Sequence, residues 1–171
     1  MAGHLSSRPV AAVWSSPLER ALRTAEAIAA KRGLTVRVDP ELTEWRMADR
    51  WAGIRWDDLP GRRPGELEAY LSDPTRLPFA AESLEELAAR MGTVLVGLHD
   101  RHRQGDVVVV GHQDPLQAAR LALTGRPLDG LLVGAPAHAA VISLRPGTPW
   151  EETARWQPDQ DPLQPDQNGE G

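Results

Sequence analysis

Hydrophobic and polar positions in the first part of the chain follow a strand pattern and then a helix pattern. Residues 9–14 are almost wholly apolar and end at two serines, which predicts a short buried strand. Apolar residues then recur at helical spacing from position 18 to position 29. We expect Ser16 as the N-cap of this helix, Pro17 as its first residue, and Glu19 as the partner that completes a capping box.

The next part of the chain loses its periodicity. Residues 35–38 alternate like a second short strand, whereas residues 39–81 carry tryptophans and prolines without a sustained period. Only residues 66–71 are expected to form one or two helical turns. Such a long irregular stretch inside a domain is typical of a functional loop or lid.

Regular patterns return in the second half. Ser83 and Glu86 have capping-box spacing, and the apolar positions from 84 to 98 predict a long amphipathic helix. Four consecutive valines at 107–110 predict a strand that is buried on both faces. A further helix is expected to begin with Asp114 as its cap and to end at residues 124–125.

These elements predict a fold class and a domain organisation. Residues 139–144 are expected to be the last strand, and the tail at 157–171, rich in Pro, Gln, Asp and Gly, is expected to be disordered. Alternating strands and helices with a valine-rich central strand predict an α/β fold of three layers, α/β/α, around a mostly parallel sheet. We therefore expect one domain over residues 1–156, followed by the tail.

Composition narrows the function classes. Of the 171 residues, 41% are hydrophobic and 25% are charged, as in ordinary globular proteins. The net charge of −5 gives no reason to expect a nucleic-acid or anionic-membrane partner. The chain has no cysteine, which excludes disulfides and thiolate metal sites. With no long apolar run and no leader pattern, we expect a cytoplasmic protein.

Candidate chemistry lies where predicted strands end. In open α/β sheets ligands bind at the carboxyl ends of strands, and both Arg20 and His112 follow such ends. A guanidinium and the free amides of a helix start can bind the same anion. The remaining histidines, at 4, 99, 102 and 138, are expected to be surface or packing residues. Asp57 and Asp58 are expected to be solvent-exposed rather than metal ligands.

Four segments carry a resemblance to a known family. Residues 16–26 resemble the S-P-L-x-R-A-x-x-T-A-E segment of the histidine phosphatase superfamily, the phosphoglycerate-mutase-like proteins. The other three segments occur in the family's order and at similar spacings. They are L-x-E with W-x-G at 42–44 and 51–53, E-S followed by arginine at 82–90, and a strand ending in H-x-D-P at 107–115.

The resemblance implies a chemistry. Family members transfer a phosphoryl group through a phosphohistidine, and basic side chains stabilise the charge that develops on the phosphoryl oxygens. By motif, Arg20 and His112 are implied as phosphate-binding and catalytic residues, and Glu44 as the proton donor. The implied ligand is a small phosphorylated metabolite, with no metal or organic cofactor. Hydrolysis is favoured over mutase activity, because the irregular region has few clustered basic residues beyond Arg62–Arg63.

One family motif is missing from this sequence. The family begins with an apolar strand that ends in Arg-His-Gly, but the 15 residues before Ser16 contain no such motif. We therefore expect an N-terminally truncated sheet without the nucleophile. Two hypotheses follow, namely an inactive truncated copy of a working phosphatase, or a short protein that binds phosphorylated ligands or partners without turnover. In both cases the exposed sheet edge next to residues 107–110 predicts self-association.

Overall fold

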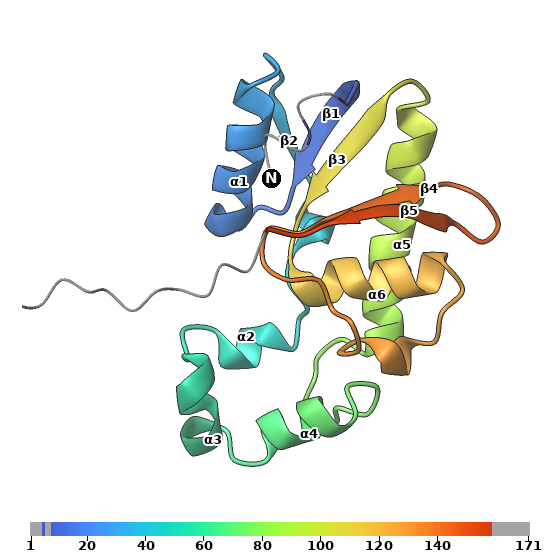
Figure 1. Ribbon diagram of the computed structural model, residues 1–171. Helices are drawn as coiled ribbons and strands as arrows, with labels where there is room; N and C mark the ends of the chain where they lie inside the picture. The colour runs from blue at the N-terminus through green and yellow to red at the C-terminus, as the bar shows by residue number, and fades with distance from the viewer. Residues whose placement is uncertain (1–4, 6–7, 159–171) are drawn as a thin grey trace, which may run out of the picture.

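Strands and helices alternate along much of the chain, and the strands form two sheets (Figure 1). The computed structural model describes residue 5 and residues 8–158. The strands are β1 (Val10–Ser15), β2 (Val36–Val38), β3 (Asp106–Val110), β4 (Val141–Arg145) and β5 (Glu151–Trp156). The α-helices are α1 (Glu19–Ala30), α2 (Ala48–Trp51), α3 (Leu59–Arg62), α4 (Glu66–Ser72), α5 (Leu84–Arg101) and α6 (Gln113–Leu123). Short 3-10 helices are found at Pro40–Leu42, Trp56–Asp58 and Leu128–Gly130.

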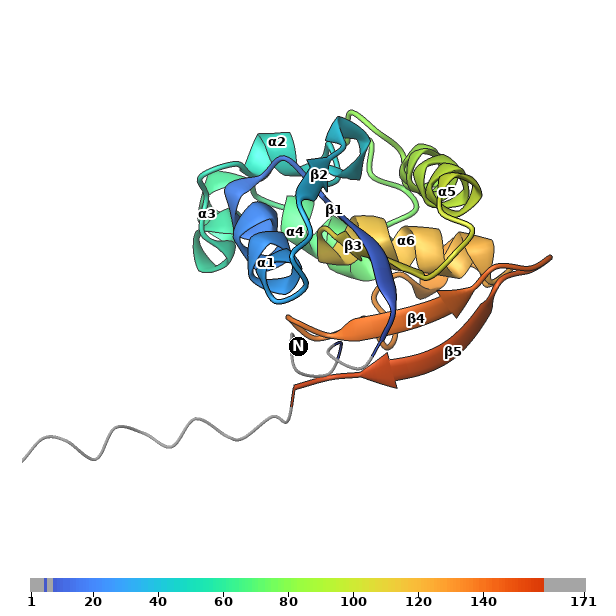
Figure 2. The ribbon, with the colours of Figure 1, turned by 90° about the horizontal axis from the view of Figure 1, so that it is seen from above.

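The larger sheet is parallel and has the strand order β2-β1-β3. The smaller sheet is the antiparallel pair β4-β5, which Figure 2 shows as a separate ribbon beside the parallel strands. Among the described residues, β3 is therefore paired along one edge only, and so is β4. This agrees with the predicted free edge next to the valine run.

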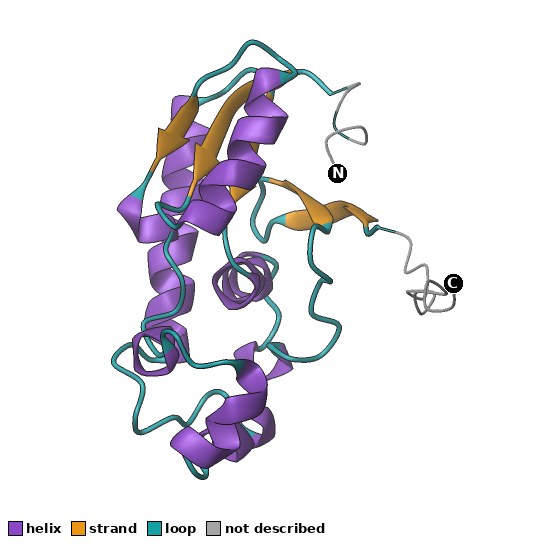
Figure 3. Cartoon of the chain, turned by 90° about the vertical axis from the view of Figure 1, so that its left-hand side faces the viewer, coloured by secondary structure: helices purple, strands orange, loops and turns teal. Residues whose placement is uncertain are grey.

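Helices pack on both faces of the parallel sheet (Figure 3). Val108 and Val110 face α1, where they pack against the cluster that contains Ile28. Val107 and Val109 point the other way and pack against the cluster that contains Leu98 of α5. The valine run thus contacts a helix layer on each face, which confirms the predicted α/β/α architecture.

Two of the three predicted helix starts are wrong. The capping box of α5 is confirmed, with Ser83 and Glu86 exchanging both hydrogen bonds. By contrast, α1 begins only at Glu19, because Leu18 is still extended and serves as the N-cap. Similarly, α6 begins at Gln113, after an extended His112, so Asp114 lies inside the first turn rather than at the cap.

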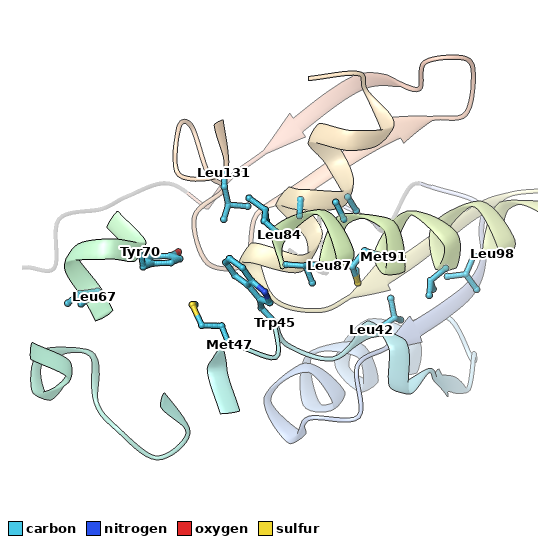
Figure 4. Close-up of a cluster of buried hydrophobic side chains, with 14 of the residues drawn as sticks. Leu42, Trp45, Met47, Leu67, Tyr70, Leu84, Leu87, Met91, Leu98 and Leu131 are labelled. Atoms are coloured by element: carbon cyan, nitrogen blue, oxygen red, sulfur yellow. The ribbon is translucent and has the colours of Figure 1, made fainter. Parts of the chain in front are cut away.

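The irregular stretch at residues 39–81 is part of the core rather than a detached loop. It forms helices α2, α3 and α4, the last of which matches the predicted turns. Its side chains Trp45, Met47, Leu67 and Tyr70 are buried in one cluster with apolar residues of α5 (Figure 4). The region that gives the weakest sequence signal is therefore held in place by packing.

The prediction that residues 139–144 form the last strand is wrong, because β5 follows and pairs with β4. Most of the predicted disordered tail, from residue 159 onward, lies outside the described residues. Within the part of the chain that is described, no helix is both long and apolar enough to cross a membrane.

Candidate functional site

The structure brings Arg20, Glu44 and His112 together at the carboxyl ends of β1 and β3. Arg20 lies in the first turn of α1, and its Nη2 donates to Glu44 Oε2 over 3.1 Å. The same carboxylate oxygen lies 3.4 Å from His112 Nδ1. All three candidate residues predicted from the sequence therefore meet at one point, although they come from segments far apart in the chain.

His112 is buried and has a partner at each ring nitrogen. Its Nε2 lies 2.7 Å from Ser16 Oγ, and that hydroxyl also accepts a hydrogen bond from the N–H of Leu18 at 3.2 Å. The serine hydroxyl and the Glu44 carboxylate thus hold the imidazole ring between them. Burial, together with the positive charge of Arg20, lowers the pKa of His112 to about 4, so the ring is neutral at pH 7.

Ser16 has a role that the sequence pattern did not reveal. Its spacing to Glu19 matches a capping box, but its hydroxyl contacts His112 instead of capping a helix. Ser16 is fully buried, and its contact with Nε2 holds the imidazole in one orientation.

Glu44 is a carboxyl group that holds its proton more tightly than usual. Burial raises its pKa, and the N–H of Trp45 and the charge of Arg20 only partly oppose this effect. A carboxyl group with a raised pKa beside an anion-binding arginine is better suited to donate a proton than an ordinary carboxylate.

A buried ion pair holds the loop that carries Glu44. Arg90 donates to both carboxylate oxygens of Glu82, from Nε over 2.6 Å and from Nη2 over 2.9 Å. Arg90 also donates to the carbonyl of Glu41, and Glu82 accepts from the backbone N–H of Arg46 over 3.2 Å. The pair therefore fixes the backbone on both sides of Glu44. From the sequence, Glu82 and Arg90 were predictable only through the family resemblance.

A second pair links the irregular region to the site. The Tyr70 hydroxyl of α4 donates to Asp114 of α6, with oxygen distances of 3.1 and 3.3 Å. Burial, followed by the nearby charge of Glu44, raises the pKa of Asp114 to about 6. Burial also raises the pKa of Tyr70, so the hydroxyl remains a donor at all physiological pH values.

The other histidines and the two adjacent aspartates considered from the sequence are not part of the site formed by Arg20, Glu44 and His112. His138 is exposed, whereas His99 and His102 are half-buried rather than surface residues. His102 Nε2 accepts a hydrogen bond from Trp14 Nε1 at 3.3 Å. Asp57 and Asp58 are exposed, as predicted, and His4 lies outside the described residues. No group of three His, Cys, Asp or Glu residues positioned to hold a metal ion occurs in the described part of the chain.

The site opens into a groove of about 990 Å³ between β3 and β4. Arg20, Glu44 and His112 line one end of it, and residues of both strands line its length. We call this space the β3–β4 groove.

An anion bound between Arg20 and His112 should change the protonation of the imidazole. A phosphate beside the ring favours the charged form, so we expect the pKa of His112 to rise above its value of about 4. The measurement is an NMR pH titration of the His112 ring signals with and without inorganic phosphate. The signals of the exposed His138 are the internal control. An unchanged His112 titration would contradict anion binding at this point.

Comparison with known proteins gives consistent matches over most of the chain. The sequence model described as "Histidine phosphatase superfamily (branch 1)" matches residues 1–159. An uncharacterized protein of Mycobacterium tuberculosis is 36% identical over 136 residues, which are 75% of this chain and 62% of that protein. The chain thus spans less than two thirds of that relative's length.

A further relative and a solved structure are both mycobacterial glucosyl-3-phosphoglycerate phosphatases. The glucosyl-3-phosphoglycerate phosphatase of M. tuberculosis is 30% identical over 168 residues, covering 91% of this chain and 74% of that protein. The solved structure of the mycobacterial glucosyl-3-phosphoglycerate phosphatase in complex with VO3 superposes with a TM-score of 0.76 at 27% identity. That superposition covers 91% of this chain and 80% of the phosphatase chain.

Proposed function

Because the chain belongs to branch 1 of the histidine phosphatase superfamily, we propose that its site binds the phosphoryl group of a small phosphorylated metabolite for ester hydrolysis. The observation that carries the proposal is that Arg20 and His112 both contact Oε2 of Glu44, over 3.1 Å and 3.4 Å. A guanidinium, a buried imidazole and a carboxyl group with a raised pKa are the groups that bind a phosphoryl group and protonate its leaving oxygen.

The proposed reaction has two steps. A histidine nitrogen attacks phosphorus, the P–O bond to the substrate breaks, and Glu44 gives its proton to the leaving oxygen. Water then attacks the phosphorus of the phosphohistidine, the P–N bond breaks, Glu44 takes the water's proton, and phosphate is released. A bound phosphate dianion raises the pKa of Glu44 further, because two negative charges compete for Arg20. Ligand binding therefore favours the protonated form of Glu44, which supplies the proton that the first step consumes.

The described residues place no second histidine at the site. Among the described histidines only His112 reaches the cluster, and its Nε2 is already hydrogen-bonded to Ser16. We therefore propose that the 171-residue chain binds phosphate without turning esters over, and that hydrolysis requires a second histidine at the site. Binding without turnover is also the behaviour expected of a phospho-ligand-binding protein.

Substitution of Arg20 tests the binding part of the proposal. We expect Arg20→Ala to weaken the binding of inorganic phosphate or vanadate at least about tenfold, because one charge-assisted hydrogen bond is lost. Arg23→Ala is the matched control, because Arg23 lies on the same helix and pairs only with Glu19 at the surface. Titration calorimetry measures both. Equal affinities in the two variants would refute the assignment of Arg20.

The turnover part needs a separate assay. We expect no release of p-nitrophenol from p-nitrophenyl phosphate by the purified chain. Steady turnover that depends on Glu44 would show that another group is the nucleophile.

We also propose that the free edge of β3 makes the purified chain self-associate, which gel filtration over a concentration series measures.

A further inference from the structure

Asp114 is a charged residue beside the site that the proposed reaction does not use. It lies in the first turn of α6, just after His112, and it is half-buried, so solvent still reaches part of it. In the described part of the chain its carboxylate accepts a hydrogen bond from Tyr70 alone. A carboxylate has two oxygens with about four acceptor positions, and the hydroxyl of Tyr70 supplies one proton. Asp114 therefore has acceptor positions left for a ligand.

The Tyr70–Asp114 pair is held next to Glu44 from two sides. Tyr70 is buried, and its ring centroid lies 6.4 Å from that of Trp45, which Figure 4 shows beside it. Trp45 directly follows Glu44, and its N–H donates to Oε1 of that carboxyl over 3.1 Å. On the other side, α6 connects Asp114 to His112, whose Nδ1 lies 3.4 Å from Glu44. The position of Asp114 relative to the proton donor is therefore fixed by packing.

Asp114 is a carboxylate whose charge no neighbouring cation balances. Arg20 pairs with Glu44, and Arg90 pairs with Glu82. Within the described residues no arginine, lysine or histidine forms an ion pair with Asp114, whose partner is a neutral hydroxyl. Burial and the charge of Glu44 raise the pKa of Asp114 to about 6, so the carboxylate is ionised above that pH.

The alcohol part of a bound ester lies within reach of this charge. In the proposed reaction, Arg20 and His112 hold the phosphoryl group and Glu44 protonates the leaving oxygen. The alcohol part then lies beside Glu44, on which side Asp114 is also found. An unbalanced carboxylate at such a place attracts a cation or a hydrogen-bond donor, and it strongly disfavours a second carboxylate.

We propose that Asp114, held by Tyr70, determines the specificity of the site. It selects phosphate esters whose alcohol part carries an ammonium or a hydroxyl group over esters whose alcohol part carries a carboxylate. This inference rests on the proposed function, because it needs the phosphoryl group bound between Arg20 and His112.

The binding of three small esters of similar size tests the preference. Phosphoethanolamine ends in an ammonium group, hydroxyethyl phosphate in a hydroxyl group and phosphoglycolate in a carboxylate. Titration calorimetry at pH 8.5 gives the affinity of each. We expect phosphoethanolamine to bind at least about tenfold more tightly than phosphoglycolate, with hydroxyethyl phosphate between them. The phosphate group is common to the three esters, so its contribution cancels in the ratios.

Substitution of Asp114 shows whether this residue makes the preference. We expect Asp114→Asn to lower the ratio between the phosphoethanolamine and phosphoglycolate affinities at least about fivefold, mainly through tighter binding of phosphoglycolate. Asp100→Asn is the matched control, because it removes the same charge near the end of α5, before β3 begins. Asp100 is 57% exposed and faces Arg103, so this variant should keep the ratio of the original protein.

The preference should also follow the titration of Asp114. In the original protein the ratio should fall as the pH is lowered from 8.5 through 6, because the carboxylate becomes neutral. Tyr70→Phe removes the hydrogen bond that lowers this pKa, so the ratio should fall at a higher pH. In Asp114→Asn the ratio should change least, and what remains reports Glu44 and His112. A merely structural role of Asp114 would not move the pH at which the ratio falls.

The outcomes separate this inference from the proposed function. Equal binding of the three esters by the original protein, with inorganic phosphate still bound, would overturn the assignment of Asp114 and leave the phosphoryl site intact. An undiminished preference in Asp114→Asn would overturn it as well, because another group would then make the selection. If neither phosphate nor any ester binds, the proposed function fails, and this inference fails with it.

Discussion

Replacing Arg90 by methionine should lower the free energy of unfolding by about 3–5 kcal/mol, because it leaves the Glu82 carboxylate buried without its partner. The side chains of Arg90 and Glu82 are only 8% and 6% exposed, and the arginine also donates to the carbonyl of Glu41. Urea denaturation at pH 7 measures the loss. Phosphate affinity should fall as well, since the loop that carries Glu44 loses the group that holds it.

Two controls make this result specific. The double variant Glu82→Gln, Arg90→Met should recover much of the lost stability, because no buried charge then remains unpaired. Arg23→Met breaks the pair with Glu19, whose side chains are 76% and 77% exposed, and should cost less than about 1 kcal/mol. If Arg90→Met costs no more than Arg23→Met, the ion pair does not support the loop.

Replacing Asp114 by asparagine should stabilise the protein near neutral pH but not in acid. The pKa of Asp114 is raised from 3.8 to about 6, so its protonated form favours folding below pH 3.8 and this contribution is lost as the pH rises through 6. At pH 7 the ionised carboxylate then costs about 2–3 kcal/mol, which asparagine removes while it still accepts the hydrogen bond of Tyr70.

The measurement is the difference in unfolding free energy between Asp114→Asn and the original protein from pH 3.5 to 7.5. The difference should grow mainly between pH 4 and pH 6. His112 titrates in the same range but is present in both proteins, so its contribution cancels in the difference. A difference that does not change with pH would mean that Asp114 does not titrate near pH 6.

The elements with strong local signals were predictable from the sequence. β1, β3 and α5 have uniform apolar runs or apolar faces, and their observed bounds agree with the predicted ones to within a few residues. Arg20 and His112 were predictable as site residues because each follows the end of a strand in the same parallel sheet. Glu44 was predictable only through the family resemblance, since no periodicity surrounds it.

The rest depends on contacts that the local sequence does not encode. Ser16 has the local pattern of a helix cap, and only the presence of His112, 96 residues later, gives its hydroxyl a different partner. Tyr70 and Asp114 are 44 residues apart, and one of them lies in a region without periodicity. β5 was missed because its positions are mostly exposed and charged, so the strand has no clear apolar alternation.

The burial of the irregular region limits which of its positions can change without a loss of stability. Leu59, Leu67 and Tyr70 are core residues, so a substitution that reshapes the region at these positions also lowers stability. Leu71 lies in the same region but is 56% exposed, and it can change at little cost. Neutral drift should therefore accumulate first at exposed positions of this kind, while the buried ones change only in a stabilised background.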